Sequence, residues 1–340
     1  MVEYDQVILS DSNRTPIVQI LTWFTLVTSI LAFVTHAGIK FYVFRTLTIE
    51  SWLVLLSLVF CIAQSIAVTV QAEFGFGKPM LTLSDHTVAS NLKSEYAATI
   101  LFIISLGFSK LAVIAFVHHL TPSELHRKIN WSVMTLVSLW TFCSVWVAAF
   151  ECRVPHPWDR RLDKCNDRLI WWNIVASLNI ATEVAIVTLE LGITAQLRVT
   201  RQRKVSVMSI FACRLLVLVA VAVQIAFFNQ ESKDVALKDD LTLGYWRSAI
   251  CNQIVQCLAI VTTCLPYTKL FMEGFESGLM GLDDSRRRGE YASKDDSKGY
   301  QLMDVSRSGH SGKSRNIQVS KSWDVQTELV TSTSSSSHPS

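Results

Sequence analysis

Residues Ser51 to Val70 read SWLVLLSLVFCIAQSIAVTV, a run without a single formal charge. A helix needs about 20 apolar residues to cross the hydrocarbon core of a bilayer. Because lipid offers no partner to free backbone N–H and C=O groups, such a run must satisfy them internally, as a helix does. The stretch therefore predicts a transmembrane helix. The preceding run from Ile17 to Ile39 is also uncharged and supports the same interpretation.

Five further apolar runs follow toward the C-terminus, at 96–120, 131–150, 169–193, 205–228 and 246–268. They explain a composition that is 50% hydrophobic and 17% charged, against about 25% charged in soluble proteins. The period-two alternation that is typical of membrane β-barrels is absent. With the runs at 17–39 and 51–70, the sequence predicts an all-α, polytopic membrane protein: a bundle of seven transmembrane helices.

Polar segments flank the predicted bundle on both sides. Residues 1–16 are a short N-terminal segment, 17–281 the membrane domain, and 282–340 a tail that ends in a run of serines. A segment of this composition cannot bury a hydrophobic core, so we expect the tail to be disordered.

The orientation rests on the loops, because seven spans place the two termini on opposite sides. Total Lys and Arg counts do not decide it, since basic residues also crowd the loop at 151–168. There, however, they alternate with acidic residues, whereas the loop at 194–204 has no acid. Its bases are Arg198, Arg201, Arg203 and Lys204. Cytosolic loops favour Lys and Arg, so we predict an outside N-terminus and a cytosolic tail, with these bases as candidate coupling residues.

The cysteines separate into two groups. Of the eight, most lie within predicted spans, where Cys packs as a small apolar residue. Cys152 and Cys165 instead share the loop that we place outside. In an oxidising outer compartment they could form a disulfide; two free thiols are the alternative.

Ionisable residues inside the spans are the first candidate site. At about 1.5 Å of rise per residue, Lys110 and Glu183 lie about 21 Å from the outer ends of their spans, and Arg214 about 14 Å from the inner end of its own. A charge at such depth costs at least about 2.5 kcal/mol and usually faces the bundle interior. We predict a buried cluster of Lys110 and Arg214 around Glu183, with Glu190 two turns farther on. It is either a ligand-dependent switch or ion relay, or a static network that fixes helix packing.

Short motifs follow one another along the chain in a recognisable order. LTIESW stands at 47–52, GFGK at 75–78 and SKL at 109–111, and the loop at 152–165 begins CRVP and ends KC. Together they resemble the fungal rhodopsin-domain family, seven-helix integral membrane proteins of filamentous ascomycetes, over roughly 17–281. The residues that carry the resemblance are Glu50, Gly75, Gly77, Lys78, Tyr96, Pro155, Trp158, Asp159 and Pro266.

Two departures from the family pattern are visible. The family often has an acidic pair at the start of its second span, where only Glu50 stands here. Its glycine loop often continues with His, where this chain has Pro79.

The resemblance, the basic loop and the tail together favour a receptor-like sensor in the plasma membrane. It would transmit an external or membrane-borne cue to cytosolic partners such as G-protein subunits; the ligand is unknown. Two alternatives stay open: a transporter or channel that uses the buried charges, and a membrane scaffold without ligand. The lipid bilayer is an expected partner and nucleic acid is not.

We expect neither an enzyme nor a cofactor. Retinal requires a Schiff-base lysine deep in the seventh helix, and the nearest one, Lys269, stands at that helix's end. His118 and His119 are adjacent, so they point about 100° apart on a helix and do not readily share a metal ion.

Overall fold

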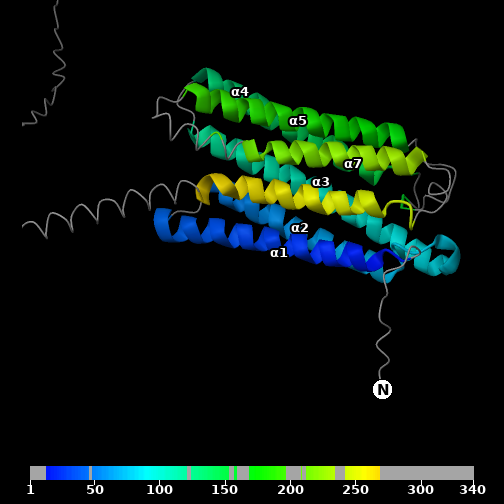
Figure 1. Ribbon diagram of the computed structural model, residues 1–340. Coiled ribbons are helices and arrows are strands. Elements are labelled where there is room, and N and C mark those ends of the chain that lie inside the picture. The colour runs from blue at the N-terminus through cyan, green and yellow to red at the C-terminus, as the bar shows by residue number, and fades with distance from the viewer. Residues whose placement is uncertain are drawn as a thin grey trace, which may run out of the picture. The chain divides into compact units, whose positions relative to one another are not determined.

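The computed structural model describes residues 13–45, 48–120, 124–152, 157–158, 168–196, 208, 212–233 and 242–268. Within them, seven helices are long and apolar enough to cross a membrane, and no β-strand forms (Figure 1). The predicted all-α, seven-helix fold is therefore confirmed. These residues belong to one unit, Met1–Asp283. The predicted tail at 282–340 lies outside the described residues, and so does its predicted disorder.

The helices follow the predicted runs in order. Their bounds are α1 Thr15–Ile39, continued by a π-helical turn η1 Lys40–Phe44, then α2 Ile49–Glu73, a 3₁₀ turn η2 Met80–Thr82, α3 Asp85–Leu120, α4 Glu124–Ala149, α5 Arg168–Gln196 and α7 Leu215–Lys233. The seventh span is Trp246–Thr268, called the last helix below.

Helix α3 begins earlier than the apolar pattern indicates. The predicted span starts at Tyr96, whereas the helix starts at Asp85. The Ser84 hydroxyl accepts a hydrogen bond from the Thr87 backbone N–H at 3.3 Å, as a helix N-cap does. Residues 85–95 are largely polar, so a search for apolar runs does not detect this extension.

Helix α3 lies at the centre of the bundle and packs against α2, α4 and α5. Its Ser105 hydroxyl donates to the Ser57 carbonyl at 2.8 Å, and the Ser57 hydroxyl donates back to the Ser105 carbonyl at 2.9 Å. At Gly107, an added Cβ would lie 2.6 Å from the Thr141 side chain of α4. Small residues thus let these helices approach closely, as is typical of membrane bundles.

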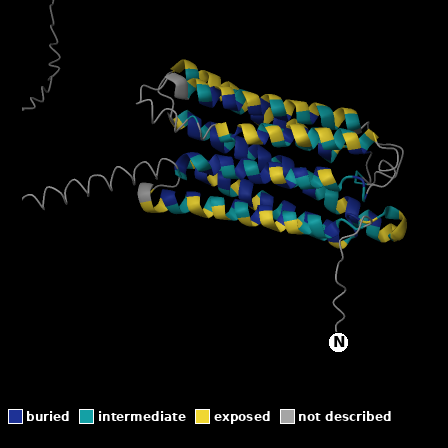
Figure 2. Ribbon diagram, viewed as in Figure 1, coloured by how far each residue is buried: buried dark blue, intermediate teal, exposed yellow. Residues whose placement is uncertain are grey.

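The outward faces of α1, α4 and α7 are exposed and apolar (Figure 2). Trp23, Phe24 and Leu31 of α1 and Phe142 and Trp146 of α4 are examples. A surface of this kind is unfavourable in water but matches lipid. The last helix is mostly buried and contacts α1 and α2 through Leu26, Cys61 and Ile260.

Candidate functional site

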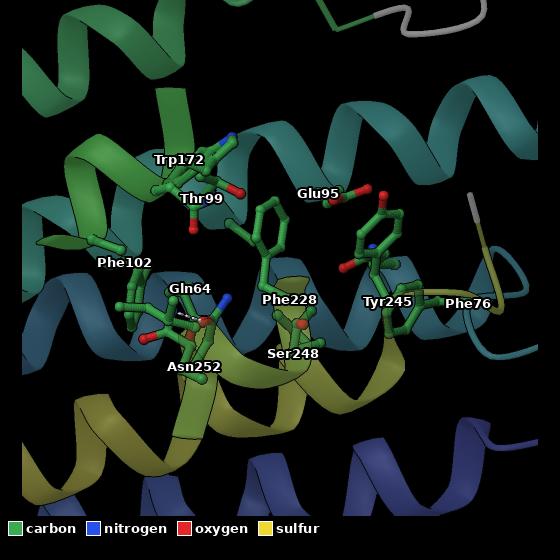
Figure 3. A pocket seen from close by; sticks show the side chains of 18 residues that line it. Gln64, Phe76, Glu95, Thr99, Phe102, Trp172, Phe228, Tyr245, Ser248 and Asn252 are labelled. Carbon is green, nitrogen blue, oxygen red and sulfur yellow. Dashed lines mark hydrogen bonds between the residues drawn. The ribbon is translucent and has the colours of Figure 1, made fainter. Parts of the chain in front are cut away.

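A cavity of about 100 Å³ opens between α2, α3, α5, α7 and the last helix (Figure 3). Its walls come from the end of α2, the early part of α3, the start of α5, the end of α7 and the start of the last helix. These segments all lie at the end of the bundle where α1 begins, hereafter the N-terminal end. The predicted topology places that end outside the cell.

The cavity walls combine aromatic rings with polar side chains. The aromatic residues are Phe76, Phe102, Trp172, Phe228 and Tyr245, and the polar ones include Gln64, Gln71, Glu95, Thr99, Ser248 and Asn252. Figure 3 shows Trp172 and Thr99 on one side of the cavity and Gln64 and Asn252 on the other. Pockets that bind small molecules usually have this mixture of apolar wall and a few polar groups.

Two α2 side chains of the cavity are not satisfied by the protein. Gln64 and Gln71 are each 2% exposed. Within the described part of the chain, Gln64 Oε1 and Gln71 Nε2 have no hydrogen-bond partner. An unmet hydrogen bond of a buried group costs about 1–3 kcal/mol. Both atoms are inaccessible to solvent, so they lie behind the cavity surface and do not face its open space.

The first charged group, the Glu183 cluster, consists of Lys110, Glu183, Glu190 and Arg214, all buried. Arg214 Nη2 lies 3.3 and 3.4 Å from the two carboxylate oxygens of Glu183. Glu190 lies within electrostatic range of both. In the described residues, Arg214 Nε and Nη1 have no hydrogen-bond partner. The pair is held by one guanidinium nitrogen only.

Lys110 lies within electrostatic range of Glu183 and Arg214, but its hydrogen bonds go to other groups. Its Nζ donates to the Asn179 side-chain oxygen at 2.6 Å, the Asn179 carbonyl at 3.1 Å and the Thr182 hydroxyl at 2.7 Å. It also lies 4.5 Å from the centre of the Trp140 ring. Neutral oxygens and an aromatic face therefore solvate this ammonium, while Arg214 occupies the Glu183 carboxylate.

The second charged group, the Glu50 cluster, lies at the opposite end of the bundle. Glu50 Oε1 accepts from Lys40 Nζ at 2.8 Å and from the Tyr267 hydroxyl at 2.7 Å, and Lys40 also donates to Thr48. His119 Nε2 lies 3.6 Å from Glu50 Oε2. The cluster joins η1, α2, α3 and the last helix.

An aromatic contact extends the Glu50 cluster into α1. The His36 ring meets the Tyr267 ring edge-on at 4.5 Å, and Lys40 Nζ lies 4.3 Å from the centre of the same ring. Both Lys40 and Glu50 are almost completely buried, at 3% and 4% exposure. The pairing offsets part of the desolvation cost of the two charges, and Glu50 Oε2 has no hydrogen-bond partner within the described residues.

Sequence reasoning missed most of the Glu50 cluster and the cavity. The predicted first span ends at Ile39, just before Lys40, but η1 continues the helix through Lys40. The useful signal is the four-residue spacing of His36 and Lys40, which places both on one helix face. Likewise, Gln64 and Gln71 stand seven residues apart on one face of an otherwise apolar span.

The glycine loop is a structural turn. Gly75 and Gly77 have φ values of 81° and 88°, a region that favours glycine. The Gly77 carbonyl accepts from the Arg14 N–H at 2.9 Å, and its N–H donates to the Thr242 carbonyl at 3.0 Å. The loop thereby joins the start of α1 to the segment before the last helix, and the exposed Lys78 follows it.

The other family positions have structural contacts where they are described. The Tyr96 hydroxyl donates to the Ala149 carbonyl at 3.1 Å, Lys93 Nζ lies 5.3 Å from the centre of the Trp158 ring, and Pro266 is buried in the last helix.

Several predicted positions cannot be placed. Cys152 is buried, but Cys165 lies outside the described residues, so their pairing stays a prediction. The remaining predicted positions outside the described residues are Pro155, Asp159, Arg198, Arg201, Arg203 and Lys204. In the described part of the chain, no group of three or more His, Cys, Asp or Glu side chains could hold a metal ion.

Comparison with known protein families shows the family to which the chain belongs. The family model described as the fungal rhodopsin domain matches residues 36–274. The chain belongs to the fungal rhodopsin domain family. The predicted membership is thus confirmed, and the matched range includes the cavity and both charged clusters of this fungal rhodopsin domain. No curated protein and no solved structure matches the chain.

Proposed function

We propose that this fungal rhodopsin-domain protein is a receptor-like sensor of the plasma membrane, with its N-terminus outside and its tail in the cytosol. The observation that carries the proposal is the cavity at the N-terminal end, which five helices line. A ligand there would touch several helices at once. It could therefore change how they pack, provided that it binds one arrangement better than the other.

Two helices extend from the cavity to the Glu50 cluster. Helix α2 contributes Gln64 to the cavity and Glu50 to the cluster, a separation of about 21 Å along the axis. The last helix contributes Ser248 to the cavity and Tyr267 to the cluster. A tilt or rotation of either helix would act on the Tyr267–Glu50 hydrogen bond. This connection supports transmission of a cue toward the side that we assign to the cytosol.

The Glu183 cluster provides a second connection. Helices α5 and α7 contribute Trp172 and Gln224 to the cavity, and the Glu183–Arg214 pair joins α5 to the residue that precedes α7. Because Arg214 retains two nitrogens without a described hydrogen bond, its pairing can change at modest cost. We assign this cluster the role of a ligand-dependent switch.

The ligand in this proposal is not retinal. Lys110 is the deep lysine of the described bundle, but it lies in α3, and three hydrogen bonds hold its Nζ. Such a nitrogen is poorly placed to form a Schiff base. Added retinal should therefore produce no red-shifted absorption band, and the appearance of one would contradict this part of the proposal.

Cytosolic coupling gives the direct test. The tagged chain is expressed in a strain of its source organism from which the natural gene has been deleted. G-protein subunits that bind the tagged chain are then captured from the membrane fraction. We expect capture to fall about tenfold when Arg198, Arg201, Arg203 and Lys204 are all changed to Ala, because the basic surface of the 194–204 loop is lost.

The matched control changes Arg286, Arg287 and Arg288 in the tail, which removes a comparable basic charge elsewhere. Equal capture by the loop variant and the natural chain would contradict the receptor role. Solute uptake that depends on Lys110 and Glu183, without any capture, would instead indicate a transporter.

A further inference from the structure

We propose that the cavity binds a small methylated ammonium cation, which the carboxylate of Glu95 attracts and the aromatic rings of the wall hold. The proposal names the ligand class of the same cavity and therefore rests on the proposed function. Both attractions act over several ångströms and require no hydrogen bond to a particular atom of the wall.

The formal charge of the described wall is negative. Among the described lining residues Glu95 is the one charged side chain, and no Lys, Arg or His accompanies it. An anion would therefore lose its hydration without gaining an opposite charge. A cation gains a Coulomb attraction that is stronger in protein than in water. Glu95 also interacts within the protein and its Oε2 has no accessible surface, so this attraction acts across the wall rather than through a direct contact.

Aromatic side chains form much of the wall. They are Phe76, Phe102, Trp172, Phe228 and Tyr245. The centres of the Phe228 and Tyr245 rings are 6.0 Å apart, and Figure 3 shows Glu95 in the half of the cavity that also holds these two rings. The face of an aromatic ring attracts a cation within about 6 Å of its centre. Because methyl groups on a nitrogen also make apolar contacts with rings, a methylated ammonium suits this wall.

The polar side chains of the wall already bond within the protein. Gln224 Nε2 donates to the side-chain oxygen of Asn252, and Asn173 Nδ2 donates to the side-chain oxygen of Asn229 at 2.8 Å. The two amides of α2 hold their unpartnered atoms behind the cavity surface. Directed hydrogen bonds therefore give the cavity little selectivity, and its charge and its aromatic faces decide which ligand binds.

Choline is the probe, and its control is the neutral analogue in which a carbon atom replaces the nitrogen. The two molecules have the same shape and the same number of heavy atoms, so the volume of the cavity affects both equally. Binding to the full-length chain in lipid nanodiscs is measured by saturation-transfer NMR, and empty nanodiscs correct for partitioning into lipid. We expect saturable binding of choline that is at least tenfold tighter than binding of the analogue, because only choline carries the charge.

Two variants separate the charge from the rings. Glu95→Gln keeps the size of the side chain and removes its charge, so choline binding should weaken about tenfold while binding of the neutral analogue is unchanged. Phe228→Leu removes one aromatic face and keeps an apolar side chain. It should weaken choline binding about fivefold, with a smaller effect on the analogue.

Each variant has a matched control that does not line the cavity. Glu73→Gln removes an exposed acid at the same end of the bundle. Phe60→Leu removes an α2 ring that stacks on Phe108. Both control variants should bind choline as the natural chain does.

The remaining outcomes overturn the ligand class. Equal or tighter binding of the neutral analogue to the natural chain would show that charge does not select the ligand, and this comparison needs no variant. Equal losses of both ligands in Glu95→Gln would show that the acid shapes the cavity and does not attract a cation. If choline fails to bind while G-protein capture still depends on the 194–204 loop, only the ligand class is wrong. If choline binds selectively without any capture, the receptor role is wrong and the ligand class stands.

Discussion

The two charged clusters differ in the length of the hydrogen bonds that each makes to its buried carboxylate. In the Glu50 cluster, one carboxylate oxygen receives hydrogen bonds of 2.8 Å from Lys40 and 2.7 Å from Tyr267. In the Glu183 cluster, a single nitrogen of Arg214 approaches the carboxylate at 3.3 and 3.4 Å. Charge-assisted N–H···O bonds are usually about 2.7–2.9 Å long. Glu50 is thus held by two short hydrogen bonds to one oxygen, and its Oε2 has no hydrogen-bond partner in the described residues; Glu183 is held by longer contacts to both oxygens.

The difference teaches where the bundle is rigid and where it can change. Loss of a partner from a buried ion pair costs about 3–5 kcal/mol, because the other charge stays buried without compensation. A pair with longer contacts has less to lose, and Glu190 lies nearby to take part in a new arrangement. We infer that the Glu50 cluster mainly stabilises the fold and that the Glu183 cluster is the part that can switch.

The largest expected effect comes from Lys40→Met. It leaves the Glu50 carboxylate buried without its cation, and the free energy of unfolding should fall by about 3–5 kcal/mol. The measurement is reversible unfolding of the purified chain in mixed micelles. The double variant Lys40→Met/Glu50→Leu removes both charges and should recover most of the loss. If the single variant is as stable as the natural chain, the pair is not tightly coupled.

A smaller effect is expected from Glu183→Gln. The loss should be about 2 kcal/mol, as for one hydrogen bond between charged groups, because the existing contact is long and Glu190 can partly replace the carboxylate. The same unfolding assay measures it. This variant should also change G-protein capture, whereas Lys40→Met should lower capture only in proportion to the amount of folded chain. A loss as large as that of Lys40→Met would remove the distinction between the clusters.

The smallest effect is expected from His119→Ala. The His119 side chain is 56% exposed, and its Nε2 lies 3.6 Å from Glu50 Oε2. Exposed ion pairs contribute about 0–1 kcal/mol, so the unfolding free energy should change by about 0.5 kcal/mol. The comparison variant is Tyr267→Phe, which removes a buried hydrogen bond to the same carboxylate and should cost more. The reverse order would show that His119, rather than Tyr267, holds Glu50.

The sequence predicted the burial of some charged residues but not of others. Lys110, Glu183 and Arg214 were recognised as buried because each interrupts a long apolar run. Lys40 was not, because it follows directly after such a run, where a charge is expected to reach water. The partners of Lys110 were also not predictable, since they depend on how α3 and α5 are rotated about their axes.

The sequence alone determined that the chain forms seven membrane helices and belongs to its family, because span length, apolar composition and motif order are local properties. Only the tertiary structure decided that Glu50 pairs with Lys40 and Tyr267, that Lys110 binds Asn179 and Thr182, and that Gln64 and Gln71 line a cavity. The physical reason is that each of these contacts joins different helices, and the rotation and depth of a helix are set by its packing against neighbours. An apolar run specifies that a helix is buried in the membrane but does not specify which of its sides meets which partner.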